Sequence, residues 1–141
     1  SEEFREDSDL STLAEELVLD LDELMPIIEC LEVLRLAYLE DDQLSLTEEG
    51  TRFAEAEVQE RKQIFAKQLS THVPLVRHIL RILRGRMDHA VSGQRFSIEL
   101  QDDLSEEAAQ EVLKTVIEWG RYAELFAYHD NTDTLSFDNP E

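Results

Sequence analysis

The sequence contains few residues that cross-link or interrupt a chain, and it has no long apolar run. Its 141 residues include one cysteine, three prolines and four glycines. A single cysteine, Cys30, excludes an internal disulfide framework and fits a reducing compartment. No apolar run approaches the ~20 residues that a membrane-spanning helix needs, and residues 1–10 lack the features of a secretory signal. We therefore expect a cytoplasmic protein with no direct membrane insertion.

Basic residues are also scarce, and they are unevenly distributed. The chain has 33 acidic and 13 basic residues, giving a formal net charge of -20. Eight of the basic residues lie between Arg61 and Arg95, where Asp88 is the single acid, so this segment carries +7 and the remainder -27. Nucleic-acid affinity depends largely on Lys and Arg neutralising phosphates. The composition therefore disfavours nucleic acid as a partner.

The apolar periodicity of the first third predicts two helices and a hairpin. Ser11 is expected to cap a short helix over 12–18, and Asp22, in preference to Asp20, to cap a second helix ending near Leu36. That second helix has an apolar stripe at helical spacing, formed by Leu24, Ile27, Ile28, Leu31 and Leu34. Alternating residues on both sides of Asp41-Asp42 predict two strands, and Thr47 is expected to cap the next helix.

The middle of the chain is predicted to be helical and basic. The helix that begins after Thr47 is expected to continue through 60–69, and another begins at Ser70 or Thr71 with Pro74 in its first turn. In that next helix the side chains expected to face inward are Val76, Ile79, Leu80, Leu83 and Met87.

The last part repeats the order of the first. A short amphipathic segment, 96–104, precedes a helix capped by Ser105 that runs to about Tyr122, and a hairpin follows with its turn at 130–133. The stretches "LAYLEDDQLSL" (36–46) and "FAYHDNTDTLSF" (126–137) also align. We predict a mainly α fold with small β-hairpins, built of tandem winged-helix-like units packed together. The expected divisions are an acidic tail or linker end (1–10), unit one (11–57), a basic helical connector contributing to the second core (58–92) and unit two (93–138).

Motifs for catalysis or cofactor binding are missing. The four glycines are scattered, and no phosphate-binding loop of the GxxxxGK or GxGxxG type exists. The four histidines lack metal-ligand spacing. Cys30 lies on an apolar stripe and is expected to be an inert core residue. We therefore expect no enzyme activity, no catalytic or metal-binding residues and no cofactor.

Two clusters are candidates for partner binding. Arg77, Arg81 and Arg84 recur at i, i+4 and i+7 with Arg86 beside them, and the stripe is expected either to be neutralised by the chain's own acidic helices or to dock on an acidic protein patch. DNA ranks third for this stripe. The other cluster is the aromatic-rich stretch 118–128, which is expected to be mostly core, with Trp119 or Arg121 reaching a partner.

Three stretches in this order resemble a known family. They are "LTEEGTRFAEA" (46–56), "ERKQIFAKQL" followed by "HVPL" (60–75), and "WGRYAELFAY" (119–128). Over roughly residues 8–138 the chain resembles the AAA-associated C-terminal domain that follows the ATPase of nitrate/sulfonate/taurine-type ABC importers. The resemblance implies an ATP-binding cassette upstream of Ser1. It supplies no catalytic residues, and the Walker motifs are absent from this chain.

The function we expect is that of a non-catalytic accessory or regulatory domain acting through protein–protein contacts. The expected partners are the ABC ATPase cassette, in cis or in trans, and transporter subunits at the inner face of the membrane, with a homodimer as a further candidate. The alternative is a winged-helix DNA-binding transcriptional regulator. That alternative needs outward Lys or Arg on the helix before each wing, whereas 20–34 has none and 105–120 has only Lys114. A small-molecule sensor with a cavity between the units is the third hypothesis.

Overall fold

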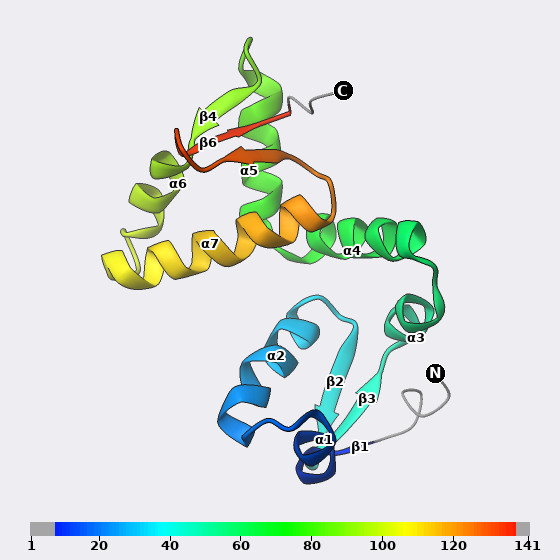
Figure 1. The fold of residues 1–141 in the computed structure, drawn as a ribbon. Helices are drawn as coiled ribbons and strands as arrows, with labels where there is room; N and C mark the ends of the chain where they lie inside the picture. Colours follow the sequence, from blue (N-terminus) through cyan, green and yellow to red (C-terminus); the bar gives the residue numbers. More distant parts are fainter. Residues whose placement is uncertain (1–7, 138–141) are drawn as a thin grey trace. The chain divides into compact units, whose positions relative to one another are not determined.

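Seven helices and two three-stranded antiparallel sheets make up the computed structural model, which describes residues 8–137 (Figure 1). The predicted mainly α fold with small β-hairpins is confirmed. The chain divides into two compact units, residues 1–68 and 69–141. Within residues 8–137, no helix is both long and apolar enough to span a lipid bilayer.

The first unit has the strand order of a winged helix. Its elements are β1 (Ser8–Asp9), α1 (Leu10–Leu17), α2 (Leu21–Val33), β2 (Ala37–Glu40), β3 (Gln43–Leu46), α3 (Glu48–Glu55) and most of α4 (Val58–His72). The sheet order is β1-β3-β2, so the strand before the helix pair lies beside the last strand of the hairpin. The first seven residues of the predicted acidic tail lie outside the described residues, as does residue 138 at the other end.

The starts of α1 and α2 differ from the prediction. Asp9 caps α1 in place of Ser11, and Asp20 caps α2 in place of Asp22. The prediction used Pro26 to place the start late, but the local chemistry favours Asp20, because the Glu23 side chain accepts a hydrogen bond from the Asp20 N–H at 2.9 Å. Pro26 therefore lies inside α2.

A small apolar cluster holds α1 and α2 against the sheet. Leu10, Ala14, Leu24 and Ile28 are buried, and partly buried neighbours pack around them, namely Leu13, Leu19, Met25, Leu39 and Leu44. The predicted stripe was wrong at Ile27, which is 48% exposed, and Cys30 is only half-buried.

The hairpin of the first unit has a two-residue turn that fits its strands. Asp41 and Asp42 both have positive φ, at 52° and 64°, as a type I′ turn requires. Thr47 caps α3 as predicted: its hydroxyl accepts from the Gly50 N–H at 3.0 Å and donates to the Arg35 carbonyl at 2.7 Å. At Gly50 a side chain would overlap the backbone carbonyl of Leu36, so only glycine allows α3 to approach so closely.

The predicted continuous helix after Thr47 is in fact two helices. Ala56 has an extended backbone at the end of α3, and α4 begins at Val58. The buried Gln68 side chain on α4 donates to the Leu34 carbonyl at 2.9 Å and so satisfies the end of α2. The boundary between the units follows Gln68, inside the segment predicted as a connector, and the α5 and β4 parts of that segment belong to the second unit.

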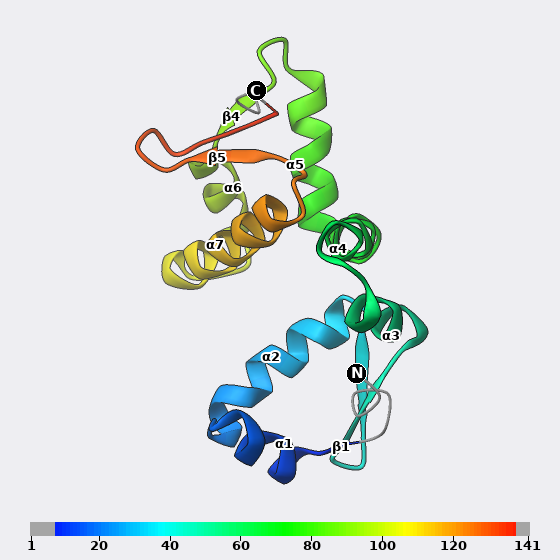
Figure 2. The same ribbon diagram turned by 45° about the vertical axis from the view of Figure 1, so that its right-hand side comes forward.

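The second unit has the full winged-helix order. It contains α5 (Pro74–Gly85), β4 (Ala90–Ser92), α6 (Gly93–Leu100), α7 (Glu106–Tyr122), β5 (Ala127–His129) and β6 (Thr134–Ser136), with sheet order β4-β6-β5. In Figure 2, α5 lies beside β4 and α7 lies beside β5. The predicted cap Ser105 is confirmed by its bond to the Ala108 N–H. Val73, not Ser70 or Thr71, caps α5, and Pro74 occupies its first turn as predicted.

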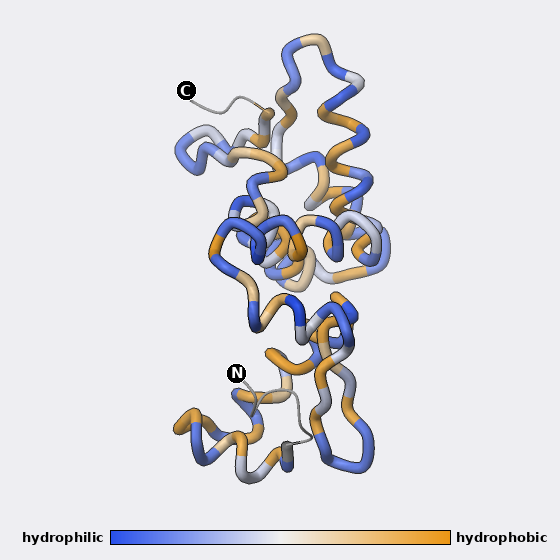
Figure 3. Tube along the Cα trace, turned by 90° about the vertical axis from the view of Figure 1, so that its right-hand side faces the viewer, coloured by the Kyte–Doolittle hydropathy of each residue, from blue (hydrophilic) through white to orange (hydrophobic). Residues whose placement is uncertain are grey.

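The core of the second unit joins α5, α6 and the sheet. Its fully buried side chains include Val76, Ile79, Leu83, Phe96 and Leu135. Figure 3 shows hydrophobic and hydrophilic residues alternating along the helices, as expected for helices with one buried face. Met87 was predicted to face inward and is instead 101% exposed, because α5 ends at Gly85 and the chain turns away.

Candidate functional site

The predicted arginine stripe lies on the outer face of α5, and its first member bonds the chain's own backbone. Arg77 donates from Nη1 to the carbonyls of Ser70 at 3.2 Å and Thr71 at 2.7 Å. Both carbonyls belong to the last turn of α4, where a cation satisfies otherwise unpaired acceptors. Arg77 therefore stabilises the α4–α5 junction.

The second arginine joins a polar network between α5 and α6. Arg81 Nη2 lies 3.3 Å from His78 Nδ1, and His78 Nε2 lies 2.9 Å from Glu99 Oε1. The other oxygen of Glu99 lies 3.3 Å from Arg95 Nε. An imidazole with its proton on Nε2 satisfies both of its contacts. Sequence reasoning missed His78 and Glu99, and only the i, i+4 spacing of Arg95 and Glu99 gave a signal.

The two arginines at the end of the stripe, Arg84 and Arg86, make the fewest polar contacts. Arg86 Nε lies 3.6 Å from Asp88 Oδ1, and both side chains are largely exposed. Among residues 8–137, Arg84 has no ion-pair partner. The structure thus places Arg77, Arg81, Arg84 and Arg86 along one helix and its end, and it engages three of them with neighbouring groups.

The aromatic stretch at the end of α7 contains both core and surface residues. Phe126 is 3% exposed, and its ring occupies the space that a side chain at Gly120 would fill. Trp119 is half-buried and Arg121 is exposed. These two candidates lie on α7, whereas the arginine stripe lies on α5 and is engaged with α4 and, through His78, with α6. The predicted residues therefore form two clusters on different helices.

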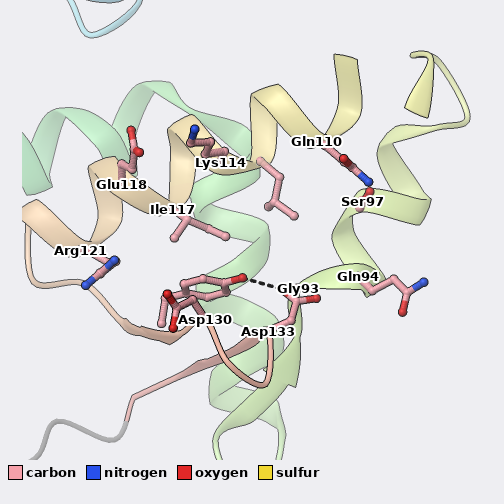
Figure 4. A pocket seen from close by; sticks show the side chains of 12 residues that line it. Gly93, Gln94, Ser97, Gln110, Lys114, Ile117, Glu118, Arg121, Asp130 and Asp133 are labelled. Atoms are coloured by element: carbon pink, nitrogen blue, oxygen red, sulfur yellow. Dashed lines mark hydrogen bonds between the residues drawn. The ribbon is translucent and has the colours of Figure 1, made fainter. Parts of the chain in front are cut away.

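A cavity of about 500 Å³ opens in the second unit between α6, α7 and the hairpin turn (Figure 4). Leu113 and Ile117 are its two aliphatic residues, and the other lining residues are glycine, Tyr128 and polar or charged side chains. The polar and glycine positions are Gly93, Gln94, Ser97, Gln110, Lys114, Glu118, Arg121, Tyr128, Asp130 and Asp133. The lining combines cations from α7 with carboxylates from α7 and the hairpin turn, so no single charge dominates. Arg121 was the one predicted residue that lies on it.

Two hydrogen bonds fix the hairpin side of this cavity. The Tyr128 hydroxyl donates to Asp133 Oδ1 at 2.7 Å, and the Gly93 N–H donates to the Asp133 carbonyl at 2.8 Å. The bond to Asp133, then burial, then the negative charges of Asp133 and Asp130 raise the pKa of Tyr128 to about 12. Tyr128 is therefore a neutral donor with a fixed orientation at neutral pH.

The helices that precede the two wings carry mostly carboxylates. On α2 the charged residues are Asp22, Glu23, Glu29 and Glu32, with no cation. On α7 four glutamates, Glu106, Glu107, Glu111 and Glu118, compare with two cations, Lys114 and Arg121. Within the described part of the chain, no three His, Cys, Asp or Glu side chains are grouped to hold a metal ion.

Comparison with known proteins identifies a family. Residues 11–129 match the sequence model of the C-terminal AAA-associated domain. Comparisons with curated proteins and with solved structures gave no match. Two of the stretches that carry the resemblance contain Gly50 and Gly120, which the structure explains by close packing against Leu36 and Phe126. The two glycines of those stretches therefore have a structural role.

Proposed function

Because the chain belongs to the family of C-terminal AAA-associated domains, we propose that it is a non-catalytic regulatory domain of an ABC-transporter ATP-binding protein. The proposed partners are the ATPase cassette, in the same chain or separate, and the transporter subunits at the cytoplasmic face of the membrane. The importer class is that of nitrate, sulfonate or taurine. The family match is the observation that carries the proposal, since membership itself supports an accessory domain associated with an ATPase.

The surface charge supports contacts with protein. A duplex would meet the carboxylates of α2 and α7 where a groove-reading helix needs Lys or Arg. The domain's field, from a net charge of -20, attracts basic protein surfaces and repels phosphates. A winged-helix scaffold of this kind serves as a compact protein-binding unit.

The test compares the ATPase with and without this domain. The cassette is purified in both forms, and ATP hydrolysis and co-purification with the transporter's membrane subunits are measured. We expect the isolated domain to hydrolyse no ATP, and its removal to change the hydrolysis rate or the subunit binding. Unchanged rates together with unchanged subunit binding would refute the proposal.

The rival function is DNA-binding regulation, which the winged-helix strand order favours. It predicts tight binding that weakens steeply as salt rises, because each phosphate contact releases counterions. A gel-shift titration of the full chain against duplex DNA at two salt concentrations separates the two. Salt-sensitive, sequence-dependent shifts would replace the protein-contact proposal, and no shift is what we expect.

A further inference from the structure

The turn between α1 and α2 exposes three apolar side chains in five residues. Leu17 is 51% exposed, Val18 87% and Leu21 47%. Between them Leu19 points the other way and packs on the core cluster of the first unit. Leu19 therefore holds the turn against the core, while Leu17, Val18 and Leu21 face solvent. We call these three exposed residues the turn patch.

Val18 holds an unfavourable backbone conformation in this turn. Its φ and ψ are 57° and 47°, and the Leu19 N–H closes the end of α1 on the Ala14 carbonyl at 2.9 Å. Glycine or asparagine is usual at such a position, whereas a β-branched residue there is a steric outlier. Arg35 and Glu124 follow α2 and α7 in the same left-handed region, and neither is β-branched.

In the described part of the unit, little packing compensates for this strain, since most of the Val18 side chain is in water. Strained residues of this kind cluster at functional sites, where the conformation serves a ligand or a partner. A strained, exposed valine between two exposed leucines therefore indicates a surface that is covered in a complex.

Carboxylates surround the turn patch. Residues 8–34 include eight acidic residues and no Lys, Arg or His. Five of the acids lie within or next to the turn and are exposed, namely Glu15, Glu16, Asp20, Asp22 and Glu23. Among residues 8–137, Glu15, Glu16 and Asp22 have no ion-pair partner. The surface is an apolar centre with an acidic rim.

This charge pattern indicates which kind of partner can bind the turn patch. A second copy of the chain would bring another net charge of -20, and four apolar side chains of its basic helix α5 are buried in its own core, namely Val76, Ile79, Leu80 and Leu83. Anionic lipid and nucleic acid are repelled for the same reason. A basic amphipathic helix matches, because its apolar face covers the patch and its Lys or Arg residues meet the rim.

We propose that the turn patch is a docking site for a basic amphipathic helix of the partner ATPase or transporter subunit. The inference rests on the proposed function, since it names the surface through which the domain makes its protein contacts. Docking removes Val18, Leu17 and Leu21 from water.

The test uses the full chain and a labelled synthetic helical peptide with leucines on one face and lysines elsewhere. Asn tolerates the left-handed region, so Val18→Asn removes the apolar side chain and relieves the strain without altering charge. We expect it to weaken peptide binding about tenfold and to raise the melting temperature. If Val18 had only a structural role, its replacement would not raise stability and weaken peptide binding at the same time.

The matched control is Met87→Asn, which removes an exposed apolar side chain from the second unit. It should leave peptide affinity unchanged, and a peptide of the same composition without an apolar face should bind the wild-type chain about tenfold more weakly. Equal affinity of wild type and Val18→Asn for the amphipathic peptide would overturn the inference. Self-association of the wild type in sedimentation, lost in Val18→Asn, would overturn it in favour of a second copy.

The ATPase assay separates this inference from the proposed function. If the wild-type domain and its Val18→Asn variant alter ATP hydrolysis equally, the turn patch is wrong and the regulatory role stands. If Val18→Asn loses the peptide while neither form affects the ATPase or its subunits, the turn patch stands as a binding site for a basic amphipathic helix, and both the regulatory role and the assignment of that helix to the ATPase or its subunits fail.

Discussion

The two units of the chain share one topology and differ in how much apolar surface they bury. Each has a helix pair and a three-stranded sheet in which the first strand pairs with the last, β1 with β3 and β4 with β6. In the described residues, fifteen apolar side chains are buried in the second unit and eight in the first. The first unit also exposes more large apolar side chains, seven against five. The second unit thus has the larger buried core, and the first exposes more apolar surface, as the proposed docking of a partner requires.

Charge separates the units as clearly as burial does. The helix pair of the first unit lies in the stretch 8–34, which has no basic residue, whereas α5 of the second unit carries Arg77, Arg81 and Arg84. Backbone hydrogen bonding and apolar burial set the topology, so exposed charges can diverge without changing it. The same topology therefore carries an acidic surface on the helix pair of the first unit and a basic surface on α5 of the second.

The largest expected effect comes from truncating the larger core. Phe96 is fully buried, and Phe96→Ala should lower the free energy of unfolding of the second unit by about 3–5 kcal/mol. Trp119 is the only tryptophan and lies in that unit, so its fluorescence in a urea titration reports the change. The matched variant Leu24→Ala in the first unit should shift the circular dichroism transition and leave the Trp119 midpoint in place. Equal shifts of both signals by both variants would mean that the units unfold together.

Glycine substitutions test the close approach in the first unit. Gly50→Ala places a methyl group against the Leu36 carbonyl and should cost about 1–3 kcal/mol, because backbone has to move. Gly85→Ala is the control, since nothing lies near its added methyl group, and it should be neutral or stabilise α5 by up to about 1 kcal/mol. Thermal unfolding of both variants measures the difference. A neutral Gly50→Ala would contradict the packing described for α3.

Helix caps allow a finer comparison of the units. Ser105→Ala removes the hydroxyl that accepts from the Ala108 N–H and should cost about 1 kcal/mol. Thr47→Ala should cost more, up to about 2 kcal/mol, because Thr47 also donates to the Arg35 carbonyl. Chemical denaturation ranks the two. The reverse order would show that the second bond of Thr47 adds nothing.

The smallest effect concerns pH. The pKa of Tyr128 is raised from 10.0 to about 12, so the folded state favours the protonated phenol. The stabilisation that follows is complete below pH 10 and is lost as pH rises towards 12. Phenolate absorbance of the wild type minus that of Tyr128→Phe should titrate at the raised value. A difference curve centred at the ordinary tyrosine pKa would refute the bond to Asp133.

Local signals explain what the sequence predicted correctly. The turn at Asp41-Asp42 and the caps Thr47 and Ser105 depend on a few neighbouring residues, and the structure confirms them. The start of α2 was predicted wrongly because two local rules competed. Pro26 argued for a late start of α2, while the Asp20–Glu23 pair, which sets it, follows an equally local rule.

Tertiary features could not be predicted in the same way. The cavity is lined by α6, α7 and the hairpin turn, and the network of Arg81, His78 and Glu99 joins two helices. Nothing in the helical spacing of Arg77 indicated that it would bond the end of α4. The left-handed conformation of Val18 was equally hidden, since sequence rules assign it to Gly or Asn.

Cys30 gives the first unit a built-in chemical probe. Burial, with a smaller effect of Glu29, raises the pKa of its thiol, so the reactive thiolate is rare at neutral pH in the folded chain. As the only cysteine, it takes up an alkylating reagent at one known position on α2. Because the thiol is half-buried, the rate of alkylation in native buffer reports how accessible that part of α2 is, and a bound partner that covers it would slow the reaction.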